Sequence, residues 1–314
     1  MSIDQKTLDK YRSFATTSSK AALTESLIAI IGAPGVGKTS LLLSASKFFK
    51  GFPNPDYNKE TGQGLIKLTD LGIVQIDPGA TDGYLSVGYD VDIIPYRKIL
   101  RDVEDPERAA EISLTLAAEW KDKDYYGLDS VSQFDDDEFN YLQQNEGLYM
   151  SEKTGKTDNR KMWDLLRSAH GTVYNSLSRL PGIKIFIGHV KAITDDLVKK
   201  GDEKQAFDRK EKTTLAGNAS ITLDVTGKSE RNWIRLNSLQ IGVRVVEDPR
   251  TRKLSRVLET EYNSTVDMAV KNRFSNLIGP NPEFNLRKII DAIRGQQVNT
   301  SSFSQTPVTP SQVK

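Results

Sequence analysis

Residues 26–40 read SLIAIIGAPGVGKTS, and this stretch decides the fold. Its first part, Ser26–Ile31, is a short apolar run typical of a buried strand. A leucine-rich helical pattern follows and extends to Gly51. Between the two lies GAPGVGKT, residues 32–39, which matches G-x-x-x-x-G-K-[ST] at every fixed position. A strand before this motif and a helix after it are the context that identifies a phosphate-binding loop.

Each residue type in this loop has a chemical purpose. Glycines let backbone N–H groups approach phosphates closely, and a helix N-terminus adds partial positive charge. Lys38, facing solvent without ligand, would reach the β- and γ-phosphates, and the Thr39 hydroxyl would bind Mg²⁺. An ordinary glycine turn would not explain the lysine–threonine pair. The nucleotide cradle is predicted to comprise Gly32, Ala33, Pro34, Gly35, Val36, Gly37, Lys38, Thr39 and Ser40.

Two aspartates end predicted buried strands and are candidates to face this loop. Asp129 follows Tyr125–Leu128, and we predict that it helps Thr39 to hold the metal ion. Asp77 ends the strand Gly72–Asp77, although Asp-Pro-Gly is also a common turn sequence.

The rest of the chain alternates strands with helices. Helices are predicted over 105–120, 162–180 and 286–294, a strand over 184–190, and a hairpin over 239–246 and 254–259. This rhythm predicts an α/β fold with a mainly parallel sheet covered by helices and an appended C-terminal hairpin. We divide the chain into a lead-in (1–25), one domain (26–295) and a disordered tail (296–314).

Composition excludes several classes of protein. The 314 residues include no cysteine, so disulfides, cysteine metal sites and thiol nucleophiles are excluded. His170 and His189 are the only histidines, and we expect His170 to be structural. No apolar run approaches the roughly 20 residues of a membrane helix, and no signal sequence opens the chain. We therefore expect a cytoplasmic protein that does not act at a membrane.

With these motifs in their order, the sequence resembles the RecA-like recombination ATPases, and more closely the phage ATP-binding proteins that anneal single strands. The order GAPGVGKTS, IVQID (73–77), YYGLDSVSQF (125–134), IFIGHV (185–190), TLAGNAS (214–220) and VKNRF (270–274) carries this resemblance. It implies a RecA-like core that hydrolyses ATP with Mg²⁺, and an oligomer that acts on single-stranded DNA.

The resemblance also assigns roles to single residues. It implies that His189 senses the γ-phosphate, and that Lys271 and Arg273 reach the ATP of a neighbouring subunit. If their segment is extended, residues two apart point the same way. The sequence departs from the family at the catalytic base, because the family's glutamate is replaced by Gly79. Either Asp77 or Asp82 would then act as the base, or hydrolysis would be slow.

Apart from the resemblance, only local charge indicates a nucleic-acid site, because the net charge is +1. Residues 226–256 carry eight basic and three acidic side chains, and Trp233 lies among them. The loop 191–215 is nearly balanced, with seven basic and six acidic residues, so it could equally be a solvated loop.

Two other functions stay open. One is a different P-loop enzyme, such as a small-molecule kinase or a GTPase. The Asn-Lys-x-Asp motif of GTPases is missing, however, and only residues 195–212 could form the lid of a kinase. The other is a nucleotide-gated structural or loader protein with little hydrolysis.

Overall fold

The computed structural model describes residues 27–78, 80–151, 154–192, 221–225, 233, 237–248, 250–261, 268 and 270–295. The predicted lead-in and tail lie outside these residues, as do Gly79, Arg231, Arg235 and most of the loop 191–215.

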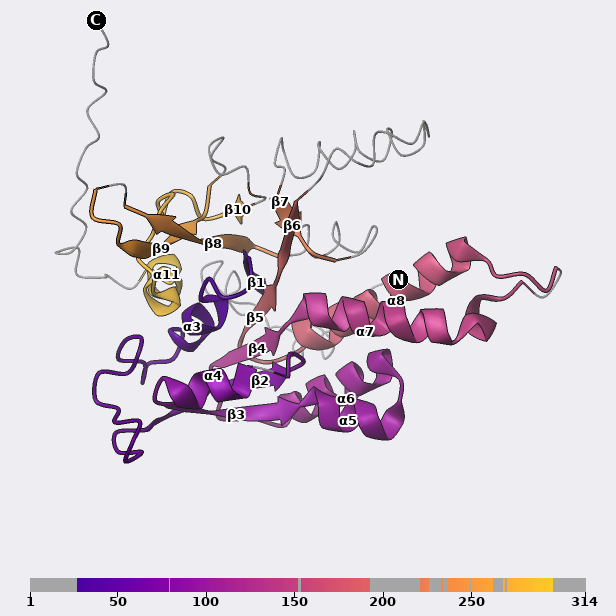
Figure 1. The fold of residues 1–314 in the computed structure, drawn as a ribbon, viewed down its shortest axis with the longest axis horizontal. Helices are drawn as coiled ribbons and strands as arrows, with labels where there is room; N and C mark the ends of the chain where they lie inside the picture. The colour runs from indigo at the N-terminus through magenta and orange to yellow at the C-terminus, as the bar shows by residue number, and fades with distance from the viewer. Residues whose placement is uncertain are drawn as a thin grey trace, which may run out of the picture.

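A mostly parallel sheet forms the centre of the molecule (Figure 1). β1 (Leu27–Gly32) pairs with β5 (Ile183–Gly188) on one side and with β8 (Leu239–Glu247) on the other, both in parallel. Beyond β5 follow β4 (Tyr125–Asp129), β2 (Ile66–Gln75) and β3 (Tyr89–Pro95), also in parallel. At the other edge, β9 (Leu254–Glu259) and the short β10 (Lys271–Asn272) both run antiparallel to β8.

Helices cover both faces of the sheet because its strands are apolar on both sides. Along β1, Ile28 and Ile30 belong to one core cluster, while Leu27, Ala29 and Ile31 belong to another. α3 (Lys38–Leu43), α4 (Ala80–Ser86) and α11 (Leu286–Ile293) contribute to the first cluster. The second includes residues of α6 (Pro106–Ala118), α7 (Val131–Gln144) and α8 (Asn159–Ser178). α5 (Tyr96–Val103) packs beside α6, and a 3₁₀ turn, η1 (Glu146–Tyr149), follows α7.

The predicted α/β class is confirmed, with a mainly parallel sheet between helices. The predicted hairpin is β8–β9, but β8 is an integral strand of the main sheet, because it pairs with β1 over five residues. The helix after the phosphate loop is shorter than predicted. α3 ends at Leu43, because the Asp70 carboxylate accepts hydrogen bonds from the Ser46 hydroxyl and, at 2.9 Å, from Lys47 N–H. None of the described helices has the length and apolar character to span a bilayer.

Candidate nucleotide site

The predicted phosphate loop connects β1 to α3 at the carboxyl end of the parallel strands. Ala33, Pro34 and Gly35 are exposed, whereas Gly32 and Ser40 at the two ends are buried. Gly35 and Gly37 adopt left-handed backbone angles, with φ of 76° and 102°. Side chains rarely adopt these angles, so the loop shape depends on glycine at both positions.

Lys38 lies inside the loop, not in solvent, so that part of the prediction is wrong. Its side chain is only 6% exposed, and Nζ donates to the carbonyl oxygens of Gly32 and Ala33, both at 2.8 Å. Nζ also lies 3.3 Å from Nδ1 of His189. Burial lowers the pKa of Lys38 to about 8, although the nearby carboxylates of Asp129 and Asp77 oppose the shift.

Thr39 of α3 and Asp129 of β4 meet although β4 and β1, the strand before α3, are not neighbours. β5 lies between β1 and β4, yet Thr39 Oγ1 donates to Oδ2 of Asp129 at 3.1 Å. Asp129 is 4% exposed, and burial raises its pKa to about 6, while the hydrogen bond from Thr39 lowers it. A buried carboxylate beside a hydroxyl is an oxygen donor pair suited to Mg²⁺.

Tyr84 of α4 was not anticipated from the sequence. Its hydroxyl lies 3.4 Å from the same Oδ2 of Asp129, and the side chain is 2% exposed. Burial raises the pKa of Tyr84 well above its usual range, and the Asp129 charge adds to the shift. Tyr84 therefore remains a neutral hydrogen-bond donor to the carboxylate.

The structure brings the other two candidate polar residues to the same edge. The backbone N–H of Asp77 donates to the Asp129 carbonyl at 2.9 Å, which places Asp77 beside the strand end. His189 follows β5, and its N–H donates to the Ser132 hydroxyl at 2.9 Å. Burial, and then the Lys38 charge, lower the pKa of His189. Because an ammonium only donates hydrogen bonds, the neutral imidazole accepts from Lys38 through Nδ1.

Oxygen atoms and one lysine thus converge at the loop, and the residues fit a magnesium–triphosphate complex. Among the described residues, no cluster of three or more His, Cys, Asp or Glu side chains could hold a metal ion by itself. The pair Thr39 and Asp129 would leave most of the coordination sphere to phosphate oxygens and water, as is usual for Mg²⁺.

Arg256 of β9 is a further residue that sequence reasoning missed at this site. It was counted with the basic segment 226–256, but its Nε donates to the carbonyl of Val36 in the phosphate loop at 3.1 Å. No local pattern distinguishes it from the other arginines of the hairpin.

Lys271 and Arg273 do not form the extended pair that was predicted. β10 ends at Asn272, and a turn begins at Arg273. Lys271 is half-buried and donates to the Asn237 carbonyl of its own chain at 2.6 Å, whereas Arg273 is exposed. Burial and the neighbouring Arg273 lower the pKa of Lys271 to about 8. Arg273 is the better placed of the two for a contact outside the subunit.

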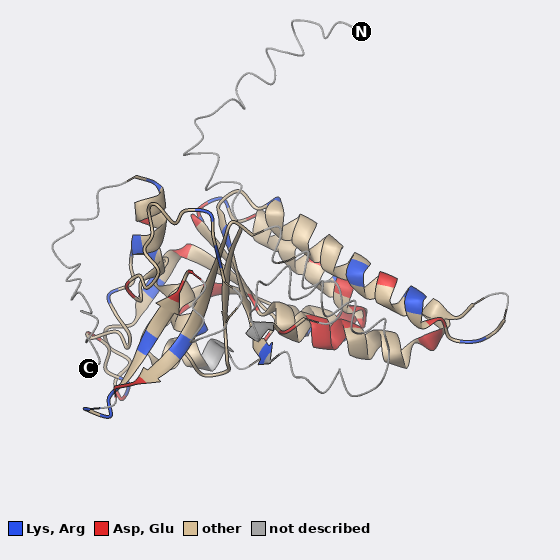
Figure 2. Ribbon diagram, turned by 90° about the horizontal axis from the view of Figure 1, so that it is seen from above, with Lys and Arg blue, Asp and Glu red and all other residues tan. Residues whose placement is uncertain are grey.

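The structure also corrects part of the nucleic-acid site predicted in residues 226–256. Trp233 is 1% exposed, donates to Nδ1 of His170 at 3.0 Å and contacts Phe186, so it is a core residue and cannot stack on bases. His170 is structural, as expected, because its Nε2 also contacts Asp135 at 2.7 Å. Arg250, Arg252 and Lys253 remain exposed at the hairpin tip. Figure 2 shows basic residues at this tip and acidic ones on α7, toward the opposite end of the molecule.

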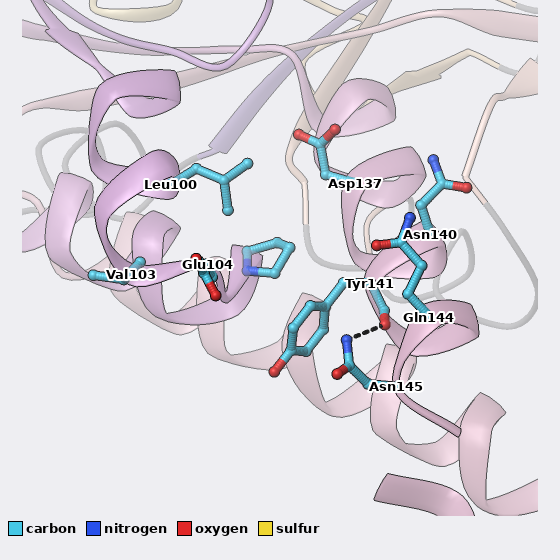
Figure 3. A pocket seen from close by; sticks show the side chains of 9 residues that line it. Leu100, Val103, Glu104, Asp137, Asn140, Tyr141, Gln144 and Asn145 are labelled. Carbon is cyan, nitrogen blue, oxygen red and sulfur yellow. Dashed lines mark hydrogen bonds between the residues drawn. The ribbon is translucent and has the colours of Figure 1, made fainter. Parts of the chain in front are cut away.

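A separate hollow of about 740 Å³ lies between α5, the start of α6 and α7 (Figure 3). Polar residues of α7, among them Asp137, Asn140 and Gln144, line one side, and Leu100 and Val103 of α5 line the other. It shares no lining residue with the phosphate loop, so it is not part of the nucleotide site.

Fold and loop together define a P-loop protein. A family model described as an AAA domain matches residues 24–274, and the chain belongs to this family of AAA-type P-loop ATPases. Among curated proteins, no match was found.

Three solved structures are distantly similar. The flagellar accessory protein FlaH from Methanocaldococcus jannaschii is 13% identical with a TM-score of 0.34, over 84% of this chain and 88% of that one. The KaiC-like protein PH0186 from Pyrococcus horikoshii OT3 is 10% identical with a TM-score of 0.30, over 75% and 78%. An ATPase from the type III secretion system of pathogenic bacteria is 12% identical with a TM-score of 0.34, over 70% and 51%.

Proposed function

We propose that this protein binds ATP with Mg²⁺ and hydrolyses it, as a RecA-like ATPase of the phage recombination and annealing type that acts on single-stranded DNA. The observation that carries the ATPase part is the hydrogen bond between Thr39 and Asp129. It joins the phosphate loop to a buried strand-end acid across an intervening strand, which is the pairing that a magnesium–triphosphate site needs.

The residues divide the work of phosphoryl transfer between them. The loop 32–40 holds the phosphates, and Thr39 with Asp129 holds Mg²⁺, which neutralises charge that develops on the transferred group. Lys38 exchanges its contacts with Gly32 and Ala33 for contacts with phosphate oxygens. His189, whose Nδ1 lies 3.3 Å from Lys38 Nζ, is our candidate for the residue that senses the γ-phosphate.

Asp77 is our candidate for the residue that orients the attacking water. It lies beside Asp129 at the carboxyl end of the sheet, and its charge acts on both Lys38 and His189. The side chain of Asp82, the other candidate, lies outside the described residues.

The nucleic-acid and oligomer parts of the proposal rest on exposed basic residues. Exposed Arg250, Arg252 and Lys253 at the hairpin tip support binding of a polyanion, and exposed Arg273 supports a contact with a neighbouring subunit's nucleotide. The exposed hairpin tip and the exposed Arg273 are both consistent with a homo-oligomer or filament in which neighbouring subunits share ATP sites.

ATP hydrolysis assayed with and without single-stranded DNA tests the proposal. We expect DNA-stimulated turnover that Lys38→Ala abolishes. Turnover indifferent to DNA would instead identify another kind of P-loop enzyme, and nucleotide binding without turnover a nucleotide-gated structural or loader protein. Unchanged turnover in Lys38→Ala would overturn the ATPase assignment itself.

A further inference from the structure

Arg256 connects two segments that are 220 residues apart in the sequence. It lies on β9 and is itself exposed, and its Nε donates to the carbonyl of Val36 at 3.1 Å. Val36 is the residue between the two left-handed glycines, Gly35 and Gly37. The hydrogen bond therefore holds the middle of the phosphate loop.

The fit between Arg256 and the loop depends on glycine. A Cβ atom built on Gly37 would lie 2.6 Å from Nε and 2.9 Å from Cδ of Arg256. The arginine side chain thus occupies the space that a side chain at position 37 would need. Gly37 is required by its backbone angle, and a side chain there would displace Arg256 from the loop.

A third segment completes the surroundings of the guanidinium. Its Cζ atom lies 5.5 Å from the centre of the Phe52 ring, within the range of a cation–π contact. Phe52 belongs to the connection between α3 and β2. The guanidinium is therefore held between the hairpin, the phosphate loop and this connection.

The charge of Arg256 is not neutralised by a described residue. On the same hairpin, Arg244 pairs with Glu259 and Arg252 pairs with Glu247, both at 2.8 Å. Arg256 has no ion pair among the described residues, and its one hydrogen bond to them uses Nε. A positive charge thus remains beside the loop where a polyanion is expected to bind.

We propose that Arg256 is a positioning residue of the nucleotide site, which fixes the backbone of the phosphate loop from the hairpin of the same subunit and so makes nucleotide binding and hairpin order depend on each other. This inference rests on the proposed nucleotide binding. It differs from the role proposed for Arg273, which acts toward a neighbouring subunit. Coupling of this kind is reciprocal: whatever stabilises the hairpin on the loop also favours the nucleotide.

Arg256→Ala tests the proposal, with Leu254→Ala as control. Leu254 lies on the same strand and is 71% exposed. Hydrogen exchange measured by mass spectrometry follows the peptides that contain residues 33–38 and 254–259. Titration of a fluorescent ATP analogue gives the affinity.

In Arg256→Ala without nucleotide, we expect faster exchange of the loop peptide, and in Leu254→Ala no change. With ATP and Mg²⁺, wild type should gain protection in the β9 peptide, and Arg256→Ala should not. Affinity should fall about tenfold, as for one lost hydrogen bond to a charged group. Arg256→Lys, which keeps the charge but lacks Nε, should restore only part of the affinity.

The proposal is overturned if Arg256→Ala leaves loop exchange unchanged and affinity within twofold of wild type. Full recovery in Arg256→Lys would overturn the backbone-positioning role and leave only a charge effect. If wild type binds no nucleotide, the proposed function fails. The loop exchange without nucleotide still decides whether Arg256 holds the loop.

Discussion

The ammonium nitrogen of Lys38 lies 3.3 Å from Nδ1 of His189, a residue 151 positions later in the chain. The loop lysine is thus bound by its own loop and by the residue that follows β5. Burial lowers the pKa of both side chains, and their proximity lowers that of His189 further. When a triphosphate binds, Lys38 exchanges its neutral partners for negatively charged phosphate oxygens. This exchange should raise the pKa of Lys38, and the rise can be measured as proton uptake.

Binding of ATP at pH 9 should be accompanied by uptake of about one proton. Burial lowers the pKa of Lys38 to about 8, and phosphate charge would return it toward its usual value of about 10.4. ATP affinity should therefore fall as the pH rises above 8. Calorimetry at pH 9 in two buffers of different ionisation enthalpy measures the uptake, with pH 7 as control. Equal heats in both buffers at pH 9 would contradict this.

Asp129→Asn should abolish hydrolysis yet stabilise the nucleotide-free fold at pH 8. The pKa of Asp129 is about 6 in the folded protein, against an ordinary 3.8. The fold therefore favours the protonated carboxyl, and this contribution to stability is lost as the pH rises from 3.8 through 6. An amide oxygen accepts from Thr39 and Tyr84 without that charge. We expect a gain of roughly 1–3 kcal/mol, or about 2–8 °C in melting temperature.

This gain should shrink as the pH falls from 6 and disappear below about pH 3.8, where Asp129 is protonated in both the folded and the unfolded chain. Asp164→Asn on the surface of α8 is the matched control and should change neither activity nor melting temperature. A variant at position 129 that melts below wild type at pH 8 would contradict the burial penalty, and one that hydrolyses normally would point to Asp77 as the metal-site acid.

Tyr84→Phe should slow hydrolysis by about three- to tenfold and raise the Mg²⁺ concentration that half-saturates the rate. The change removes only the hydroxyl that contacts Asp129, a hydrogen bond worth on the order of 1 kcal/mol, and keeps the packed ring. Tyr89→Phe is the contrast, because that hydroxyl bonds the backbone of Lys50 and Gly51. It should lower the melting temperature and leave the Mg²⁺ dependence unchanged. Identical Mg²⁺ dependence in both variants would exclude a role for Tyr84 at the metal.

Arg273→Ala should bind ATP almost normally but hydrolyse it poorly. Its own phosphate loop is intact, and the missing charge would be the one that a neighbour's γ-phosphate meets. Mixing it with Lys38→Ala, which is defective on the other side of the interface, should recover part of the activity. If both variants assemble and the mixture stays inactive, Arg273 does not act across the interface.

Affinity for single-stranded DNA should fall with salt, and joint replacement of Arg250 and Lys253 by alanine should flatten the dependence. Each lost phosphate contact reduces the slope of log K against log[salt] by about 0.7. Arg160→Ala at the start of α8 is the control and should leave the slope unchanged. A salt-independent affinity, or none with ATP and Mg²⁺ present, would contradict DNA binding at the hairpin.

The parts of the fold that could be predicted are those that local sequence determines. The strand Tyr125–Asp129 has the predicted bounds, and the helix at Pro106 begins as predicted, because Asp105 accepts the Arg108 N–H and proline fills the first helical position. α7 was missed, since residues 135–138 read DDDE and hide its buried face. Asp135 and Glu138 are themselves buried there, whereas charged residues in a sequence usually indicate a solvent-exposed position.

The site was predictable only where one motif contained it. Lys38 and Thr39 are marked by the loop, and Asp129 by its place at a strand end. Tyr84 and Arg256 reach the site through contacts across 45 and 220 residues, for which no local pattern exists. Burial of Lys38 and Trp233 was missed for a related reason, because a side chain's surroundings depend on how the segments pack.

The small sheet of β6 (Val190–Ala192) and β7 (Ile221–Leu223) joins the two ends of residues 193–220, with Ala192 opposite Ile221. Both ends are fixed on the scaffold: the Asp224 N–H donates to the His189 carbonyl at 2.8 Å, and Lys191 donates to the Val225 carbonyl at 2.8 Å. The chain therefore leaves and re-enters the described part of the fold at neighbouring points next to His189, and this two-stranded junction links residues 193–220 to the histidine that contacts Lys38.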